Sequence, residues 1–166
     1  SLAEQNMPLV WYTLDETDAA PARFVAYLAA AFRLHFPKLA LLVLSVSGDE
    51  NTAGDALDTL VNALHSHITQ PTLLALDDFH TVGASPEVHS LAEQFIQHMP
   101  DDLRVVIATR QSLSWPAMVT WRAKGQMREI SREALAFSPE ETVTLFRETF
   151  GLQLPSAEIA RLHDRT

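Results

Sequence analysis

Residues 71–82, PTLLALDDFHTV, place two adjacent carboxylates directly after a short apolar run. An unbroken apolar run of this length is typical of a strand that is buried on both faces, as the strands of parallel sheets are. Ligands bind to such sheets at the carboxyl ends of the strands. The stretch therefore predicts an α/β fold in which Asp77 and Asp78 lie at the ligand-binding edge of a parallel sheet.

Strand and helix patterns alternate along the rest of the chain. Apolar runs predict strands near residues 9–14, 72–77, 103–109 and 127–131. Between the strands, apolar residues recur at helical spacing. The apolar run 39–47 fits either a strand or a short buried helix, because periodicity does not separate the two. The alternation predicts a mainly parallel sheet with helices on both faces.

Capping signals divide the C-terminal part of the chain. Ser138 and Glu141 form a capping box at the start of a helix, and Gly151 fits its C-terminal cap. This helix would open a helical region that follows the sheet. We therefore expect an α/β domain over residues 1–137 and the start of a helical region over residues 138–166.

The composition excludes several classes of protein. The longest unbroken apolar run, Phe24–Phe32, is far shorter than the roughly 20 residues that span a bilayer. Cysteine is absent, and no signal peptide opens the chain, which suits a cytoplasmic protein without a membrane partner. The net charge of -9 argues against direct nucleic acid binding by this chain.

The acidic pair matches the Walker B element of P-loop nucleotidases. Asp77 would hold the Mg²⁺ of a bound nucleotide, and Asp78 would orient or deprotonate the attacking water as the catalytic residue. The next strand ends in Thr109 and Arg110, which would lie beside the nucleotide, with Arg110 near its terminal phosphate. Alternatively, the two acids only cap the junction between a strand and a loop.

The phosphate-binding motif of these nucleotidases is missing from the 166 residues. That motif, Gly-x-x-x-x-Gly-Lys-Ser/Thr, cradles phosphates with its backbone N–H groups. The nearest candidate, GDENTAGD at 48–55, has the wrong glycine spacing and carries Asp55 where the lysine is required. We therefore expect no ATP to bind to this chain by itself, and expect it to be inactive as an enzyme.

Three stretches together resemble a known family. The chain is similar to the ATP-binding domain of MalT-like regulators, the large ATP-dependent LuxR-type transcriptional activators of the STAND class of P-loop NTPases. The resemblance rests on VWYTLDETDAAPARFVAYLAAAF (10–32), LLALDDFHTVGASPEVHSLAEQFIQHMPDDLRVVIATR (73–110) and RAKGQMREISREALAFSPEETVTLF (122–146). In the family, the Walker A strand and helix closely precede the motif that begins at Trp11, so the chain is expected to begin just after Walker A.

The resemblance implies how a longer parent protein would work. The parent would bind ATP and Mg²⁺ and use slow hydrolysis as a signalling switch, acting as a regulatory ATPase. Other domains of the parent would bind the inducer and DNA. The alternative is a scaffold or protein-interaction domain that keeps the fold without binding nucleotide.

The resemblance also implies a gap in the sheet. In the family, the Walker A strand lies between the strands that correspond here to 103–109 and 127–131. Without it, the edge of 103–109 would expose unpaired N–H and C=O groups, which are costly to leave bare. Either residues 127–131 pair with this edge or a second copy of the chain does, so self-association is expected.

Several other side chains could bind a metal or ligand, but structural roles explain most of them at least as well. His80 could join the two acids as a metal ligand, but it more simply fixes the loop by hydrogen bonding. Trp11 is expected to be buried, whereas Trp115 and Trp121 are expected to be more open to a ligand or partner. Six basic residues could face a triphosphate or a neighbouring subunit, or could form an ordinary solvated surface; they are Arg104, Arg110, Arg122, Lys124, Arg128 and Arg132.

Overall fold

The computed structural model describes residues 7–39, 52–152, 158, 159 and 161. The chain divides into two compact units, Ser1–Val119 and Thr120–Thr166. The boundary expected at residue 137 lies inside the second unit. The ambiguous apolar run 39–47 falls almost entirely outside the described residues, since only Leu39 is described.

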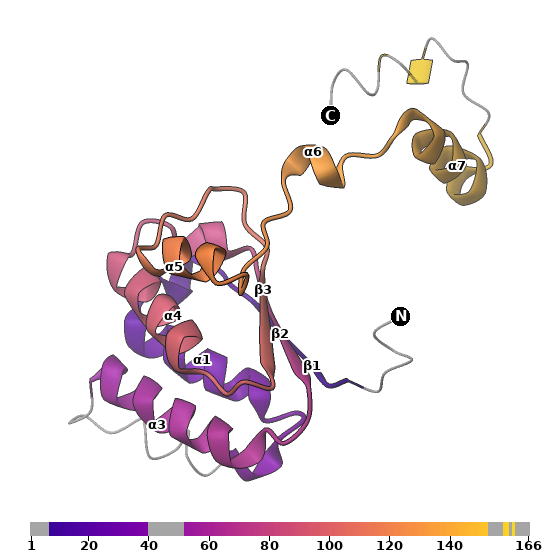
Figure 1. The fold of residues 1–166 in the computed structure, drawn as a ribbon. Helices are drawn as coiled ribbons and strands as arrows, with labels where there is room; N and C mark the ends of the chain where they lie inside the picture. The colour runs from indigo at the N-terminus through magenta and orange to yellow at the C-terminus, as the bar shows by residue number, and fades with distance from the viewer. Residues whose placement is uncertain (1–6, 40–51, 153–157, 160, 162–166) are drawn as a thin grey trace. The chain divides into compact units, whose positions relative to one another are not determined.

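The first unit is built on a three-stranded parallel sheet (Figure 1). Its strands are β1 (Leu9–Thr13), β2 (Thr72–Asp77) and β3 (Leu103–Ile107), in the order β1-β2-β3. The predicted α/β class and parallel sheet are therefore confirmed. The strand predicted at 127–131 is wrong, because these residues have no strand structure. In the described residues the sheet contains only β1, β2 and β3, so residues 127–131 pair with no strand. An isolated strand is unfavourable because its backbone N–H and C=O groups stay unpaired.

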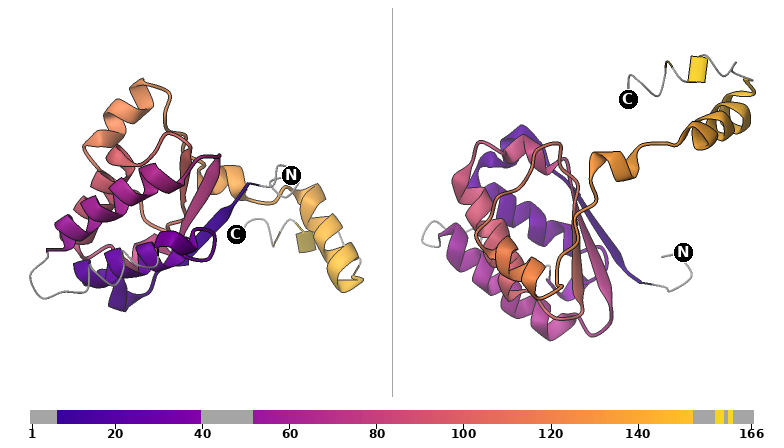
Figure 2. Two further views of the ribbon diagram at one scale, coloured as in Figure 1. Left: turned by 90° about the horizontal axis from the view of Figure 1, so that it is seen from below. Right: turned by 45° about the horizontal axis from the view of Figure 1, so that its top comes forward.

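Three amphipathic helices cover one face of the sheet: α1 (Pro21–Phe32), α3 (Ala53–His67) and α4 (Pro86–His98). Both views of Figure 2 show them on the same side of the strands. Their apolar stripes meet the inward side chains of the strands in a core whose largest fully buried members include Phe24, Phe32, Leu57, Leu64, Leu74, Leu76 and Phe95. Burial of each such side chain contributes about 1.5–3 kcal/mol to folding.

The opposite face of the sheet is open in the described residues. Trp11, Ala75 and Val106 are register partners across the three strands. Trp11 is 57% exposed and Val106 is 52% exposed. The expectation of helices on both faces is thus not met in the part of the chain that is described. An apolar run indicates that a strand is buried, but it does not show which elements pack against the strand. The prediction of helices on both faces therefore went beyond what the pattern contains.

Short elements complete the first unit. Single 3₁₀ turns lie at η2 (Glu16–Ala19), η3 (Pro37–Leu39) and η4 (Phe79–Val82). The helix α5 (Ala117–Ala123) begins in the first unit and ends in the second. No helix in the described ranges is both long and apolar enough to cross a bilayer.

The second unit contains α6 (Arg132–Leu135) and α7 (Pro139–Phe150). The predicted capping box of α7 is confirmed, because the Ser138 side chain accepts from the Glu141 N–H and the Glu141 side chain accepts from the Ser138 N–H. Gly151 ends the helix at a φ of 66°, which a glycine adopts without steric cost. No residue of α6 or α7 is buried.

Candidate functional site

The acidic pair lies where the carboxyl ends of the three strands meet. On one side, the Leu14 N–H after β1 donates to the Asp77 carbonyl at 3.0 Å. On the other side, the Phe79 N–H donates to the carbonyl of Ala108, just after β3, also at 3.0 Å. The loop after β2 is therefore fixed by both neighbouring strands. The predicted position of Asp77 and Asp78 at this edge is what the structure shows.

Asp78 adopts a left-handed backbone conformation, with φ 53° and ψ 34°. It is the only non-glycine residue with a positive φ in the described part of the chain. Such a conformation costs of order 1 kcal/mol and persists only where surrounding contacts enforce it. Here, the Thr81 hydroxyl and the Thr81 N–H both donate to the Asp78 carbonyl, at 2.9 and 3.0 Å. Strain of this kind concentrates at functional sites.

The two carboxylates differ in their surroundings. Asp77 Oδ1 accepts the N–H of Asp78 at 3.0 Å, which turns the Asp77 side chain back toward the loop. The Asp78 side chain is 46% exposed. Carboxylate oxygens in such a pair suit Mg²⁺, which usually takes one or two protein carboxylates together with phosphate oxygens. In the described residues, no group of three or more His, Cys, Asp or Glu side chains could hold a metal without such help.

His80 faces the second carboxylate. Its Nδ1 lies 3.7 Å from Asp78 Oδ1. The same Nδ1 is buried and has no hydrogen-bond partner among the described residues. Nδ1 therefore makes no loop-fixing hydrogen bond to the described residues, and it lies near Asp78 Oδ1 at a distance slightly too long for a hydrogen bond.

Thr109 and Arg110 follow β3 at the same edge. The Thr109 hydroxyl accepts the Gln111 N–H at 3.2 Å and donates to the Gln111 carbonyl at 3.0 Å, so this hydroxyl already stabilises its own turn. Arg110 is exposed and has no ion-pair partner among the described residues. Arg110 is thus the better candidate of the two for a ligand contact.

Gln111 connects the two loops, and the sequence patterns did not single it out. A Cβ atom on Gly83 would lie 2.9 Å from Gln111 Oε1 and 3.0 Å from the His80 carbonyl oxygen. Gly83 therefore allows the close approach of the Gln111 side chain to the loop after β2. A glycine with an ordinary negative φ gives no sequence signal for such packing.

An aromatic cluster anchors the acidic loop to α4. Phe79 is fully buried, and its ring packs edge-on against Trp115 and His89, with centroids 5.7 and 5.2 Å apart. The Trp115 indole N–H donates to His89 Nδ1 at 3.0 Å. Trp115 is only 7% exposed, whereas Trp11 is 57% exposed. The predicted burial of these two tryptophans was therefore reversed: the helix cover expected over Trp11 is absent, and Phe79 and His89 enclose Trp115.

The His89 ring makes the stability of this cluster pH-dependent. Burial lowers the pKa of His89 below its ordinary value of about 6.5. In the folded chain Nδ1 must accept from Trp115, so the neutral ring is favoured. The unfolded chain then binds more protons as the pH falls, and the free energy of unfolding should decrease as pH drops below about 6.5 and level off below the folded pKa. Urea titrations at a series of pH values would measure this.

A matched variant isolates the contribution of His89. His89→Asn places an amide oxygen close to the position of Nδ1, so it keeps an acceptor for the Trp115 indole but does not titrate. We expect its stability to fall less between pH 7.5 and 5 than that of the wild type. Equal losses in the two proteins would show that other groups cause the acid sensitivity.

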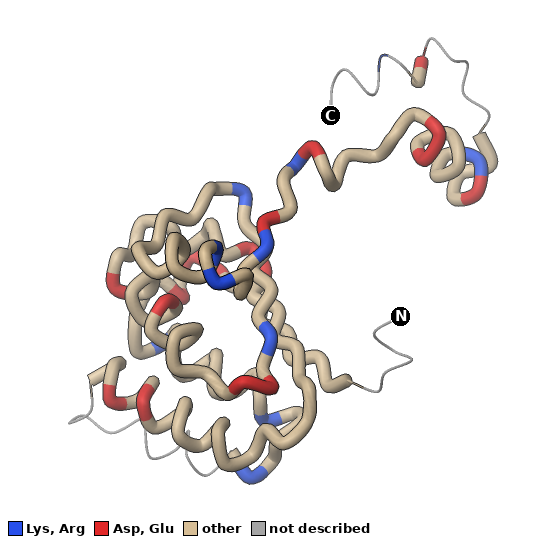
Figure 3. Tube along the Cα trace, viewed as in Figure 1, with Lys and Arg blue, Asp and Glu red and all other residues tan. Residues whose placement is uncertain are grey.

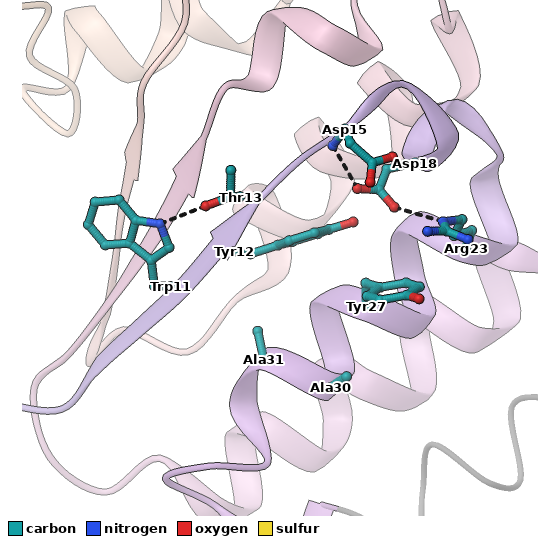
Figure 4. Close-up of a pocket in the computed structure, with 9 residues that line it drawn as sticks. All are labelled: Trp11, Tyr12, Thr13, Asp15, Asp18, Arg23, Tyr27, Ala30 and Ala31. Atoms are coloured by element: carbon teal, nitrogen blue, oxygen red, sulfur yellow. Dashed lines mark hydrogen bonds and ion pairs between the residues drawn. The ribbon is translucent and has the colours of Figure 1, made fainter.

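A second polar cluster lies between β1 and α1 (Figure 4). Asp18 is 3% exposed, and its carboxylate accepts from the Asp15 N–H at 3.0 Å and from Arg23 Nε at 3.1 Å. The Arg23 guanidinium also stacks on the Tyr27 ring, 4.7 Å from its centroid. Burial raises the pKa of Tyr12 above its usual range, with the negative charge of Asp18 as the next cause. Asp18 thus stabilises η2, and α1 begins after Ala20 without a side-chain cap.

The basic residues between 104 and 132 are divided between the two units of the chain; Figure 3 marks the Lys and Arg positions along the trace. Arg104 and Arg110 belong to the first unit, and the other four belong to the second. Arg122 pairs with Glu129 at 2.7 Å. These observations give no support to a single phosphate-facing basic patch.

The described residues of the GDENTAGD stretch do not form a phosphate cradle. Gly54 and Asp55 lie in the first turn of α3, and the Asp55 carboxylate accepts the N–H of Thr52 at 3.0 Å in a capping box. Thr52 donates its hydroxyl to the same carboxylate at 2.6 Å. Asp55 therefore holds a negative charge at the helix start where a phosphate would need N–H donors.

Fold and site together define an α/β domain whose parallel sheet presents a strained acidic pair at its carboxyl edge. Comparison with known proteins agrees with the resemblance found in the sequence. The chain is 27% identical over 165 residues to the HTH-type transcriptional regulator MalT of Yersinia enterocolitica, covering 98% of the chain and 18% of that protein. It is 28% identical over 159 residues to MalT of Serratia proteamaculans, covering 94% of the chain and 17% of that protein.

The predicted resemblance to MalT-like regulators is thus confirmed over nearly the whole chain. The chain spans less than a fifth of the length of these curated relatives. No family model matches it.

Proposed function

We propose that the chain is part of the nucleotide-binding domain of a MalT-like transcriptional regulator of the LuxR and STAND classes. The observation that carries the proposal is the acidic pair at the carboxyl end of β2, with Asp78 held in a left-handed conformation between two loops. Such a strained and well-fixed carboxylate is expected at a reacting group. The similarity to MalT regulators supports the same function.

Each polar side chain of the edge has a role in this proposal. Mg²⁺, when bound with a nucleotide, would neutralise phosphate charge. Asp77 would hold the ion, because only one of its carboxylate oxygens accepts the Asp78 N–H. Asp78 would accept a proton from, or orient, the attacking water. Arg110, exposed at the end of the neighbouring loop, would contact the terminal phosphate.

In the longer protein, ATP hydrolysis would reset a signalling switch and would not drive a metabolic reaction. ATP binding and slow hydrolysis would change the state of the protein, while other domains would bind the inducer and DNA. The chain described here accounts for less than a fifth of the curated relatives' length, which leaves ample sequence for those domains.

Substitution of the two acids tests this proposal. In the full-length protein, Asp77→Asn should weaken Mg-ATP binding or uncouple it from hydrolysis, because an amide is a poorer ligand for Mg²⁺. Asp78→Asn should lower the ATP hydrolysis rate by about 100-fold with binding largely kept, because an amide does not accept the proton of the water. Isothermal calorimetry and a phosphate-release assay would separate binding from hydrolysis.

The exposed Asp101 in the loop before β3 provides a matched control. Asp101→Asn removes one negative charge from the same unit and should leave binding and hydrolysis unchanged. If neither acid-pair variant differs from this control in ATP turnover, the Walker B assignment of Asp77 and Asp78 is wrong.

A second candidate function is a scaffold that binds no nucleotide. The observation that favours it is the absence of a phosphate-binding motif from the 166 residues. Under either function we expect this chain alone to show no measurable ATP affinity, since Mg²⁺ held by one carboxylate stays largely hydrated. The full-length protein distinguishes the two, because a scaffold would not bind Mg-ATP.

We further propose that the isolated chain self-associates through the free edge of β3. In the described residues β3 pairs with β2 alone, and the alternative of pairing with 127–131 is wrong. An open edge is a template for another chain. Light scattering should therefore give a mass above that of a monomer, and Val105→Pro, which removes a backbone donor from β3, should shift it toward the monomer. A monodisperse monomer at high concentration would contradict this.

A further inference from the structure

The loop after β2 contains a buried ring nitrogen, His80 Nδ1, that makes no hydrogen bond to the described residues. His80 Nδ1 has no hydrogen-bond partner in the described part of the chain, although buried polar atoms nearly always have one. The Asp78 carboxylate lies close to this nitrogen, with Oδ1 at 3.7 Å. A movement of less than about 1 Å would bring the two atoms to the usual distance of a hydrogen bond to a carboxylate.

The backbone on both sides of this pair is fixed. Thr81 holds the Asp78 carbonyl through its hydroxyl and its N–H, and Phe79 between the pair is fully buried. The His80 carbonyl accepts the Gly83 N–H at 3.1 Å. Because the main chain is held, the freedom left to the pair lies in the two side chains, which are 46% exposed for Asp78 and 21% exposed for His80.

We infer that His80 is the positioning residue for Asp78: its Nδ1–H donates to the Asp78 carboxylate and sets the direction in which that carboxylate meets the attacking water. This inference rests on the proposed function of Asp78. A carboxylate that is half-exposed on a fixed backbone rotates freely unless a donor holds one of its oxygens. The donor also leaves the second oxygen available to the water.

The position of the ring supports a donor role over a metal-ligand role. Nδ1 is buried and lies 3.7 Å from Asp78 Oδ1, so it is not open to a ligand that approaches from solvent. The neutral ring has one N–H, and placing it on Nδ1 satisfies the buried atom, whereas placing it on Nε2 leaves two acceptors face to face.

Two substitutions separate positioning from packing. Asparagine places an amide N–H close to the position of Nδ1, while glutamine places one close to that of Nε2. In the full-length protein, His80→Gln should lower kcat for ATP hydrolysis by about tenfold or more, the effect of losing one hydrogen bond to a charged group, with KM unchanged. His80→Asn should restore most of the rate. Equal rates in the two variants would overturn the inference.

A second measurement does not depend on nucleotide. Nitrogen-15 NMR of the 166-residue chain at neutral pH reports which ring nitrogen of His80 carries the proton. We expect the Nδ1–H tautomer in the wild type and a shift toward Nε2–H in Asp78→Ala. A dominant Nε2–H tautomer in the wild type would overturn the inference even if ATP hydrolysis is confirmed. If the Nδ1–H tautomer is found but the full-length protein has no ATPase activity, the proposed function is refuted, whereas the contact between His80 and Asp78 still stands.

Discussion

Replacing Phe79 by alanine should lower the free energy of unfolding by about 3–5 kcal/mol, the usual cost of removing a fully buried phenylalanine from a core. Phe79 is 0% exposed, and its ring packs against both Trp115 and His89. The residue also lies between Asp78 and His80, so the same change should free the acidic loop. Urea denaturation followed by tryptophan fluorescence would measure the loss.

Phe79→Leu is the matched control for this change. Leucine keeps most of the apolar volume but loses the edge-to-face contacts, which contribute about 0.5–1.5 kcal/mol each. We expect the leucine variant to lie much closer to the wild type. If Phe79→Ala and Phe79→Leu were equally destabilised, aromatic geometry and not filled volume would stabilise the loop. A loss below about 1 kcal/mol in both would show that the loop is not anchored by this side chain.

The sheet and the acidic pair could be predicted because their signals are local. An apolar run that ends in two acids needs no information about the rest of the chain, and β2 has the bounds that were expected. The same holds for α7, where Ser138, Glu141 and Gly151 all lie within one helix. Capping residues satisfy backbone groups of their own helix, so tertiary contacts rarely override them.

The failed predictions concern what covers or pairs with an element. The stretch at 127–131 has strand character, but a strand forms only beside a partner. Trp11 has a sequence context typical of burial, yet its side chain is exposed and lies on the side of β1 away from α1 (Figure 4). Such outcomes depend on residues distant in sequence, and periodicity carries no information about them.

The candidate site was predicted in outline but not in detail. The alignment of His80 with Asp78 and the packing of Gln111 on Gly83 both depend on loop geometry. The left-handed conformation of Asp78 has a weak sequence signal, since aspartate tolerates it better than most residues do. Only the structure shows that the loops after β2 and β3 are joined by the hydrogen bond from Phe79 to Ala108.

Replacing the buried Asp18 by alanine should lower the free energy of unfolding by about 2–4 kcal/mol, because it leaves partners of a buried carboxylate unsatisfied. The Asp15 N–H and Arg23 Nε both donate to Asp18 at present. The Tyr12 hydroxyl is buried beside them and has no hydrogen-bond partner of normal geometry among the described residues. Thermal and urea unfolding would measure the change.

Asp15 is the matched control, because it belongs to the same capping box but is exposed. Its carboxylate accepts from the Thr17 hydroxyl and from the Thr17 N–H, the latter at 2.7 Å, and these two hydrogen bonds, the hydroxyl's first, lower the pKa of Asp15. Water can replace the lost acceptor in Asp15→Ala, so its destabilisation should be clearly smaller than that of Asp18→Ala. Equal losses in the two variants would mean that the cap of η2, and not the buried carboxylate, stabilises the connection from β1 to α1.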